Sequence, residues 1–456
     1  MARRKLLVAD LVGLTPGVLE HTPKIRSFFN DGFVTPIATV FPAVTCTAQA
    51  SFLTGAQPSS HGIVANGWYF RNLDEVFFWR QSRALIEGAS IFDDMKQLGK
   101  TSANLFGWYN WNCGADYSIT PKPSYPADGR KFPGIHTEPL ELRAEIESQL
   151  GAFPLFNFWG PTASIVSSEW IAKSTAHVIN KNAPEFVFCY LPHLDYDHQR
   201  FGPGDARSIR AAAEVDRVAA ELFETARARG YEILAFSEYG ITDVSIPVFL
   251  NKSFRVAGLL RARLDPYSGE LPLFGSSRAF AVCDHQIAHI YISDAKDIEY
   301  IRKFLLAIDG VERVLDRNEQ REFQIQHNNS GELVAIAKPN CWFAYNYWTD
   351  DALAPDFART VDIHRKPGYD PAELFVDPTI SLPMARVAVN LLKKKLGFRY
   401  LMKMISLDPS MVRGSHGRLP QSNNSGPVAL GTRGATPPVD LTITGLRASI
   451  QQYFKQ

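Results

Sequence analysis

The chain has no apolar stretch long enough to span a bilayer. Its N-terminus, MARRKLLVADLVGL, has basic residues before an apolar run, as a secretion signal does. Asp10 interrupts that run, however, and no small-x-small cleavage site follows it. We therefore expect a buried first strand in a soluble, cytoplasmic protein that has no membrane partner.

Cysteine is also scarce. Five cysteines in 456 residues are an odd number at wide spacing, and none forms a CxxC pair. This excludes a disulfide framework and a zinc knuckle, and it indicates free thiols in a reducing compartment. The cysteines lie at positions 46, 113, 189, 283 and 341.

Excess charge is absent as well. The chain has 48 Lys and Arg residues against 47 Asp and Glu residues, a formal net charge of +1, and its basic residues are spread along the sequence. Such a distribution gives no electrostatic footprint for a nucleic-acid polymer. Internal repeats and long blocks of like charge are not evident, and the oligomeric state is left open.

The chain does have enough apolar side chains for a large core, at 45% hydrophobic and 12% aromatic residues. Strand-like apolar runs alternate with helical patterns: residues 5–14, 33–41, 185–192 and 231–240 read as strands, and residues 162–181 and 206–230 as helices. This alternation predicts an α/β fold, a doubly wound and mostly parallel sheet with helices on both faces. Such sheets bind ligands where their strands end. Four polar candidates lie at those ends: Asp10, Thr45, Asp195 and Glu238.

Two stretches interrupt the alternation and are interpreted as caps over the strand ends. Residues 68–160 are rich in Trp, Tyr, Pro and Asn, and residues 255–400 contain a strand–helix–strand pattern near 288–316. The α/β core then comprises residues 1–67, 161–254 and 401–456.

One segment raises the question of chemistry directly. Residues 41–55 read FPAVTCTAQASFLTG, which places Thr45 between an apolar run and helix-compatible residues. Thr45 could simply cap the helix by accepting a backbone N–H. The same position suits a nucleophile, because helix N-termini favour anions and a nearby metal ion would lower the pKa of the hydroxyl.

Residues 41–66 carry a fixed pattern: Phe41, Pro42, Thr45, Ser51, Thr54, Gly55, Pro58, His61, Gly62, Ile63 and Asn66. This pattern resembles the type I phosphodiesterase/nucleotide pyrophosphatase branch of the alkaline phosphatase superfamily. The resemblance implies that Thr45 is the nucleophile and a metal ligand, and that Asn66 bonds a phosphoryl oxygen, while His61 is structural.

Three later segments, near residues 191–203, 235–241 and 412–420, are similar to the metal-binding segments of that family in order and separation. By the same resemblance, Asp195, Glu238 and His416 are metal ligands. The family binds two divalent ions, usually zinc.

The sequence departs from the family at several ligand positions. Val12 stands where the first acid is expected, although Asp10 lies two residues earlier on the same strand face. Gln199 replaces a histidine that is found one residue earlier, at His198. Tyr239 replaces another histidine, and a neutral phenol is a poor metal ligand.

The remaining ligands are rich in oxygen, which favours one or two divalent ions, either zinc or Mn and Mg. The expected ligands are Asp10, Thr45, Asp195, Glu238 and His416; the weaker candidates are His198, Gln199, Tyr239 and His364.

Other polar groups are open to two interpretations. Asp284 and His285 are expected in a cap loop, where they would contact the substrate or supply the missing imidazole. Asp362 and His364 would ligate a metal ion, or would belong to a tight turn in which Arg365 and Lys366 are solvated.

Taken with the resemblance, these residues predict a metal-dependent hydrolase. Its small, phosphorylated substrate would be a phosphate mono- or diester, a pyrophosphate or a phosphonate, attacked by Thr45. Two alternatives stay open: a phosphoryl transferase or mutase on the same scaffold, and a non-catalytic ligand-binding protein with degraded metal sites.

Overall fold

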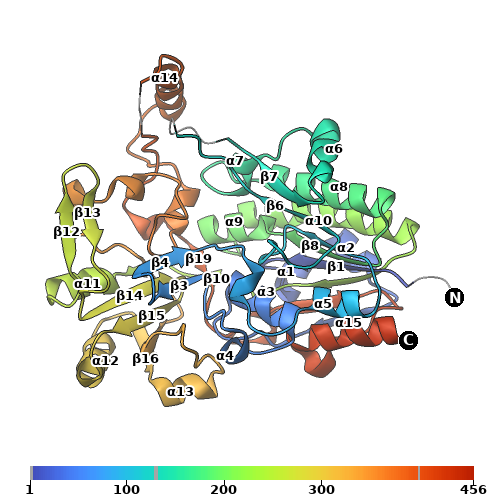
Figure 1. Cartoon of the computed structure of the whole chain (residues 1–456), viewed down its shortest axis with the longest axis horizontal. Helices are drawn as coiled ribbons and strands as arrows, with labels where there is room; N and C mark the ends of the chain where they lie inside the picture. Colours follow the sequence, from blue (N-terminus) through green and yellow to red (C-terminus); the bar gives the residue numbers. More distant parts are fainter. Residues whose placement is uncertain (1–3, 128–131, 399–400) are drawn as a thin grey trace.

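The computed structural model describes residues 4–127, 132–398 and 401–456. Its centre is an eight-stranded sheet in the order β2-β20-β9-β1-β8-β5-β6-β7 (Figure 1). Strands β9, β1, β8, β5 and β6 run parallel, and β20 and β7 run antiparallel to their neighbours. The predicted mostly parallel α/β sheet is thus confirmed. The strands are β1 Leu6–Leu11, β2 Phe33–Pro36, β5 Ser102–Leu105, β6 Tyr117–Pro121, β7 Ile135–Glu138, β8 Phe186–Leu191, β9 Glu232–Phe236 and β20 Val428–Gly431.

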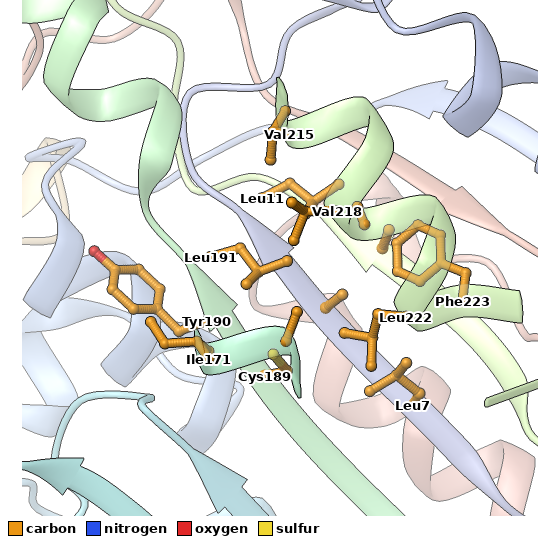
Figure 2. Packing of buried hydrophobic residues seen from close by; sticks show 14 of the residues in the cluster. Leu7, Leu11, Ile171, Cys189, Tyr190, Leu191, Val215, Val218, Leu222 and Phe223 are labelled. Atoms are coloured by element: carbon orange, nitrogen blue, oxygen red, sulfur yellow. The ribbon is translucent and has the colours of Figure 1, made fainter. Parts of the chain in front are cut away.

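Helices cover both faces of this sheet, as a continuously apolar central strand requires. Every residue of β1 is buried, and alternate side chains join different cores. Leu7 and Leu11 pack with α8 and α10, for example against Val215 and Phe223 (Figure 2). Leu6 and Val8 belong to the core on the opposite face, beneath α3, α5 and α15. These helices are α3 Thr45–Thr54, α5 Ile91–Gln97, α8 Ile165–Lys181, α10 Ala206–Ala228 and α15 Gly445–Lys455.

A second, smaller sheet lies beside the first. Its order is β14-β15-β17-β16, it is antiparallel throughout, and it packs with α11 and α12. The tight β14–β15 turn places His285 at φ +59°. Its successor Gln286 donates a backbone hydrogen bond to the carbonyl of His416, so this turn is tied to the central site. The elements are β14 Ala279–Asp284, β15 Ile287–Ile292, β16 Val311–Leu315, β17 Leu333–Ala337, α11 Leu250–Val256, α12 Ile298–Leu306 and α13 Arg317–Glu322.

The stretch 68–160 differs from its expected role as a cap. Its strands β5, β6 and β7 are hydrogen-bonded into the central sheet. They escaped sequence reading because they are four or five residues long and contain polar residues such as Asn104 and Thr120. The hairpin of β3 and β4 contributes Val76 and Phe78 to the core of the second sheet.

The remaining elements are short or peripheral. The helices are α1 Pro16–Leu19, α2 Pro23–Phe28, α4 Pro58–His61, α6 Glu141–Leu150, α7 Leu155–Phe158, α9 His193–Phe201 and α14 Pro383–Lys395; the strands are β3 Gly67–Phe70, β4 Glu75–Phe78, β10 Thr242–Asp243, β11 Ile246–Val248, β12 Ala262–Asp265, β13 Gly269–Pro272, β18 Cys341–Phe343 and β19 Gly414–Ser415. Within the described ranges, no helix combines the length and apolarity that crossing a membrane requires.

Candidate active site

Thr45 is the first residue of α3, and its hydroxyl does not cap the helix. The N-cap is Val44, which is extended and offers no side-chain cap. The Oγ1 of Thr45 instead lies 2.8 Å from the phenol oxygen of Tyr239, and the side chain reaches a large cavity. The capping interpretation is therefore wrong, and the hydroxyl faces the end of the sheet where ligands bind.

The Tyr239 phenol connects that hydroxyl to two further side chains, Asp195 and His416. The phenol of Tyr239 lies 3.5 Å from Oδ1 of Asp195, and the same oxygen lies 3.8 Å from Nε2 of His416. Nδ1 of His416 donates to the carbonyl of Ala43 at 2.8 Å, so Nε2 carries the lone pair, and this atom has no partner among the described residues. The Tyr239 and His416 rings stack with their centroids 3.7 Å apart.

Burial sets the protonation of this group. It raises the pKa of Asp195 to about 7, and it raises the pKa of Tyr239 well above 10. It lowers the pKa of His416 well below 6.5. At neutral pH, Tyr239 is thus a protonated phenol, His416 is a neutral imidazole, and the carboxyl group of Asp195 is close to the midpoint of its titration.

Asp195 is held by a neighbour on its own helix. Gln199 donates to Oδ2 of Asp195 at 2.8 Å and accepts from the hydroxyl of Tyr369 at 2.8 Å. Gln199 thus orients Asp195 through a hydrogen bond, and both side chains come from α9.

Asp10 and Glu238 form a buried cluster around Gln49, one helical turn after Thr45, and the Thr45 hydroxyl lies close enough to Glu238 to lower its pKa. The amide Nε2 of Gln49 donates to Oδ2 of Asp10 at 3.2 Å and to Oε1 of Glu238 at 2.7 Å. Its Oε1 accepts from the backbone N–H of Trp108 at 2.7 Å. Burial raises the pKa of Asp10 to about 7, and burial together with the neighbouring Asp10 raises the pKa of Glu238 well above 4.5. The Gln49 amide thus bridges the two carboxyl groups, while Oδ1 of Asp10 and Oε2 of Glu238 have no partner among the described residues.

The oxygen and the nitrogen of the Asn66 side-chain amide both form hydrogen bonds within the protein. Its Oδ1 accepts from the backbone N–H of Cys46 at 2.9 Å, and its Nδ2 donates to Oδ1 of Asp284 at 3.1 Å. The backbone N–H after Thr45 is therefore taken by Asn66. Asn66 is buried and is not among the residues that line the cavity, so its contact with a phosphoryl oxygen stays a prediction.

Asp284 and His285 form a dyad at the β14–β15 turn. Nδ1 of His285 donates to Oδ1 of Asp284 at 2.7 Å, while Nε2 of His285 has no partner among the described residues. The His285 ring lies between Tyr369 and His416, with both centroid separations at 3.7 Å. Burial lowers the pKa of His285 well below 6.5, so it is a neutral base. His285 also lines the cavity, beside His416.

The cavity has a volume of about 1860 Å³. Its walls are mostly aromatic and aliphatic, and its cationic side chains are those of Arg80, Lys122 and Arg365. At the buried end it reaches Thr45, Asp195, Tyr239, His285 and His416. The aromatic stretch 106–112 contributes Phe106, Trp108 and Trp111 to the wall, and Phe106 and Trp108 also pack in the two cores of the central sheet.

The residues present fit one divalent ion better than two. In the described parts of the chain, no group of three His, Cys, Asp or Glu side chains is placed to hold a metal ion. Asp195 and His416 form a pair that could share an ion, because the unpartnered Nε2 of His416 lies beside a carboxyl oxygen of Asp195. The Thr45 hydroxyl is connected to this pair by its contact with Tyr239. The second position does not fit, because the Gln49 amide stands between Asp10 and Glu238.

Two weaker ligand candidates lie elsewhere. His198 is buried next to Gly13 and does not line the cavity. His364 is exposed on the cavity wall. The expectation of a solvated Lys366 is wrong: its ammonium group is buried between Asp370 and Glu373, at 2.7 Å from each.

Sequence reasoning missed Gln49 and Tyr369. Gln49 follows Thr45 by four residues on the same helix, and that spacing was the available signal. Tyr369 comes from a distant loop with no local pattern, and only the fold brings it to Gln199.

The chain matches a known family and several solved structures. Residues 6–370 match the family described as type I phosphodiesterase / nucleotide pyrophosphatase. Among solved structures, the chain is similar to a phosphonoacetate hydrolase from Sinorhizobium meliloti 1021 in complex with phosphonoformate, with 16% identity, a TM-score of 0.62, and coverage of 99% of this chain and 96% of that chain.

Two further solved structures share the fold. A murine ectonucleotide pyrophosphatase/phosphodiesterase 5, an inactive Thr-to-Ala variant in complex with AMP, has 15% identity and a TM-score of 0.60 over 99% of this chain and 95% of that chain. The human protein of that name has 14% identity and a TM-score of 0.62, with the same coverage.

Proposed function

Because the chain belongs to the type I phosphodiesterase/nucleotide pyrophosphatase family, we propose that it is a hydrolase with Thr45 as the nucleophile. Its substrate is a phosphorylated or phosphonylated small molecule, as phosphonoformate and AMP in the solved relatives are. A cavity of about 1860 Å³ exceeds what inorganic phosphate needs, which favours a diester or phosphonate with a bulky organic group.

The observation that carries the proposal is the position of the Thr45 hydroxyl. It opens to the cavity, it is paired with Tyr239 at 2.8 Å, and an aspartate and a neutral histidine lie behind that phenol. The murine relative is inactive as a Thr-to-Ala variant, which supports a catalytic threonine in proteins of this fold.

In the first step, Oγ1 of Thr45 attacks phosphorus, the P–O or P–C bond to the leaving group breaks, and the leaving group departs with the electron pair of that bond and takes a proton from water. The hydroxyl proton passes to the phenol oxygen of Tyr239 as the phenol's own proton moves toward Oδ1 of Asp195. The raised pKa of Asp195, about 7, suits this acceptor to neutral pH.

In the second step, water attacks the phosphoryl-threonine and the Thr45 oxygen leaves with a proton. The unpartnered Nε2 of His285 is a base for that water, and Asp284 holds the tautomer that exposes it. The remaining Nδ2 hydrogen of Asn66 stabilises a phosphoryl oxygen in both steps.

A divalent ion, if bound, would be held by Asp195 and His416 near Thr45, and it would polarise the phosphoryl group and acidify the hydroxyl. The oxygen-rich donor set favours Mn or Mg as much as zinc. A non-catalytic ligand-binding role is the alternative that the lack of a three-residue metal cluster in the described chain favours.

Turnover of methyl p-nitrophenyl phosphate, measured with and without added Mn²⁺ or Zn²⁺, tests the proposal. Thr45→Ala is expected to lower kcat/KM by about 10³-fold. Thr47→Ala is the matched control, since Thr47 is buried on the same helix and its hydroxyl has no partner in the described chain. Equal turnover by wild type and Thr45→Ala would refute the threonine mechanism, and release of the phosphoryl group to an added alcohol in preference to water would assign a transferase.

A further inference from the structure

Helix α14 is unusual in this fold. It stands apart from both sheets at the top of Figure 1. The described residues at 382–398 and Leu401 expose many large apolar side chains, among them Met384, Leu392 and Leu396. Exposed apolar clusters of this kind mark a surface that meets an apolar partner.

The helix has two apolar faces with different surroundings. Pro383, Val387 and Leu391 recur every four residues and line the active-site cavity. Val389, Leu392 and Leu396 recur on another face, do not line that cavity, and are half or more exposed, at 64% for Leu396. One face therefore forms part of the cavity wall, and the other has no neighbour in the described chain to bury it.

Charge around α14 is one-sided. Residues 378–407 contain six Lys and Arg residues and no Asp or Glu, in a chain whose net charge is +1. Arg386, Lys393, Lys395 and Lys403 are exposed beside the apolar face. An apolar helix face flanked by basic side chains matches the interface of an anionic membrane, where apolar residues enter the acyl boundary and cations meet head groups.

The cavity is continuous from this helix to Thr45. Phe398, Leu401 and Met404 follow α14 along its wall, and Phe156 and Phe158 face it from α7. A phosphate group at Thr45 thus shares one cavity with an apolar route that begins at the helix.

We propose that α14 docks on an anionic lipid surface and that the cavity receives the apolar chain of an amphiphilic phosphate or phosphonate drawn from that surface. Only one part of this proposal rests on the proposed function, namely that the phosphate or phosphonate head group binds at Thr45. It revises the expectation of no membrane partner, which considered only spanning segments; a helix that lies in the interface needs no such length.

Vesicle flotation tests the docking surface without any need for turnover. Wild type is expected to float with vesicles of phosphatidylcholine and phosphatidylglycerol and not with phosphatidylcholine alone. The Leu392→Glu/Leu396→Glu variant should lose about 90% of that binding, whereas Val256→Glu, which alters an 81% exposed valine on α11, should float as wild type does. Equal flotation of all three proteins, or none by wild type, overturns the docking. If wild type does not float but forms a dimer, and the Leu392→Glu/Leu396→Glu variant is monomeric, the apolar face binds a second copy of the chain. That result also overturns the docking on lipid.

Whether the cavity receives an apolar chain is tested by the binding of dodecylphosphonate and of methylphosphonate, each followed by the fluorescence of the cavity tryptophans. Dodecylphosphonate is expected to bind about 100-fold more tightly or better. Phe156→Asp should remove most of that advantage and leave flotation unchanged. Equal affinity of the two probes overturns the amphiphilic substrate. A protein that floats and prefers the long chain but fails to turn over methyl p-nitrophenyl phosphate refutes the proposed hydrolase and leaves this inference standing.

Discussion

Replacing Gln49 by methionine tests the claim that an amide, rather than a cation, holds the buried carboxyl groups together. Methionine has a similar length and shape, but it cannot donate to Asp10 and Glu238 or accept from the N–H of Trp108. Gln49 is fully buried, so water cannot replace these bonds without a rearrangement.

The magnitude follows from the three partners left without a bond. Each buried polar group that loses its partner costs about 1–3 kcal/mol. A proton shared between Asp10 and Glu238 offsets part of this cost. We expect a loss of about 3–6 kcal/mol in the free energy of unfolding, which is a large part of the roughly 5–15 kcal/mol that folded domains have.

Urea unfolding followed by tryptophan fluorescence at pH 6 measures this loss. With a slope of about 3 kcal/mol/M, the midpoint of Gln49→Met should fall by roughly 1–2 M. Gln97→Met, on the exposed surface of α5, is the control and should unfold as wild type does. A Gln49→Met midpoint equal to that of the control would refute the reasoning, because it would mean that the carboxyl groups are held by something else.

Two further outcomes follow from the same site. Burial raises the pKa of both Asp10 and Asp195 to about 7, so the folded chain binds the protons of these two carboxyl groups more tightly than the unfolded chain does. In metal-free protein the resulting stabilisation of the folded state is complete below about pH 4. It is lost as the pH rises to 7, and the loss is up to about 4 kcal/mol for each acid. The urea midpoint should therefore be lower at pH 8 than at pH 5, and Asp10→Asn should make the difference between the two midpoints smaller. A midpoint that rises with pH would contradict the assignment. Asn66→Ala should lower kcat/KM for methyl p-nitrophenyl phosphate by about 10²-fold, with an unchanged value showing that Asn66 only holds Asp284.

The sequence predicted the family and the mostly parallel sheet, and both are confirmed. Thr45, Asp195 and His416 lie together because each follows a strand or loop whose end meets the same sheet edge. Their catalytic and ligand roles stay predictions, since geometry shows proximity and not turnover.

The sequence could not reveal interactions between distant segments. Lys366 looked solvated because its partners Asp370 and Glu373 are seen only when a turn closes around them. The role of Tyr369 depends on the same turn, and β5 to β7 were hidden because short strands with polar residues lack a clear period. The basic stretch at 378–407 was overlooked because charge was averaged over the whole chain.

The stereochemistry at phosphorus tests the central claim most directly. One enantiomer of methyl p-nitrophenyl phosphorothioate is hydrolysed in ¹⁸O-labelled water, and the configuration of the product is read by phosphorus NMR. Attack by Thr45 followed by attack of water gives two in-line inversions, so the account predicts net retention. Net inversion would mean that water attacks the substrate directly, and Thr45 would not be the nucleophile.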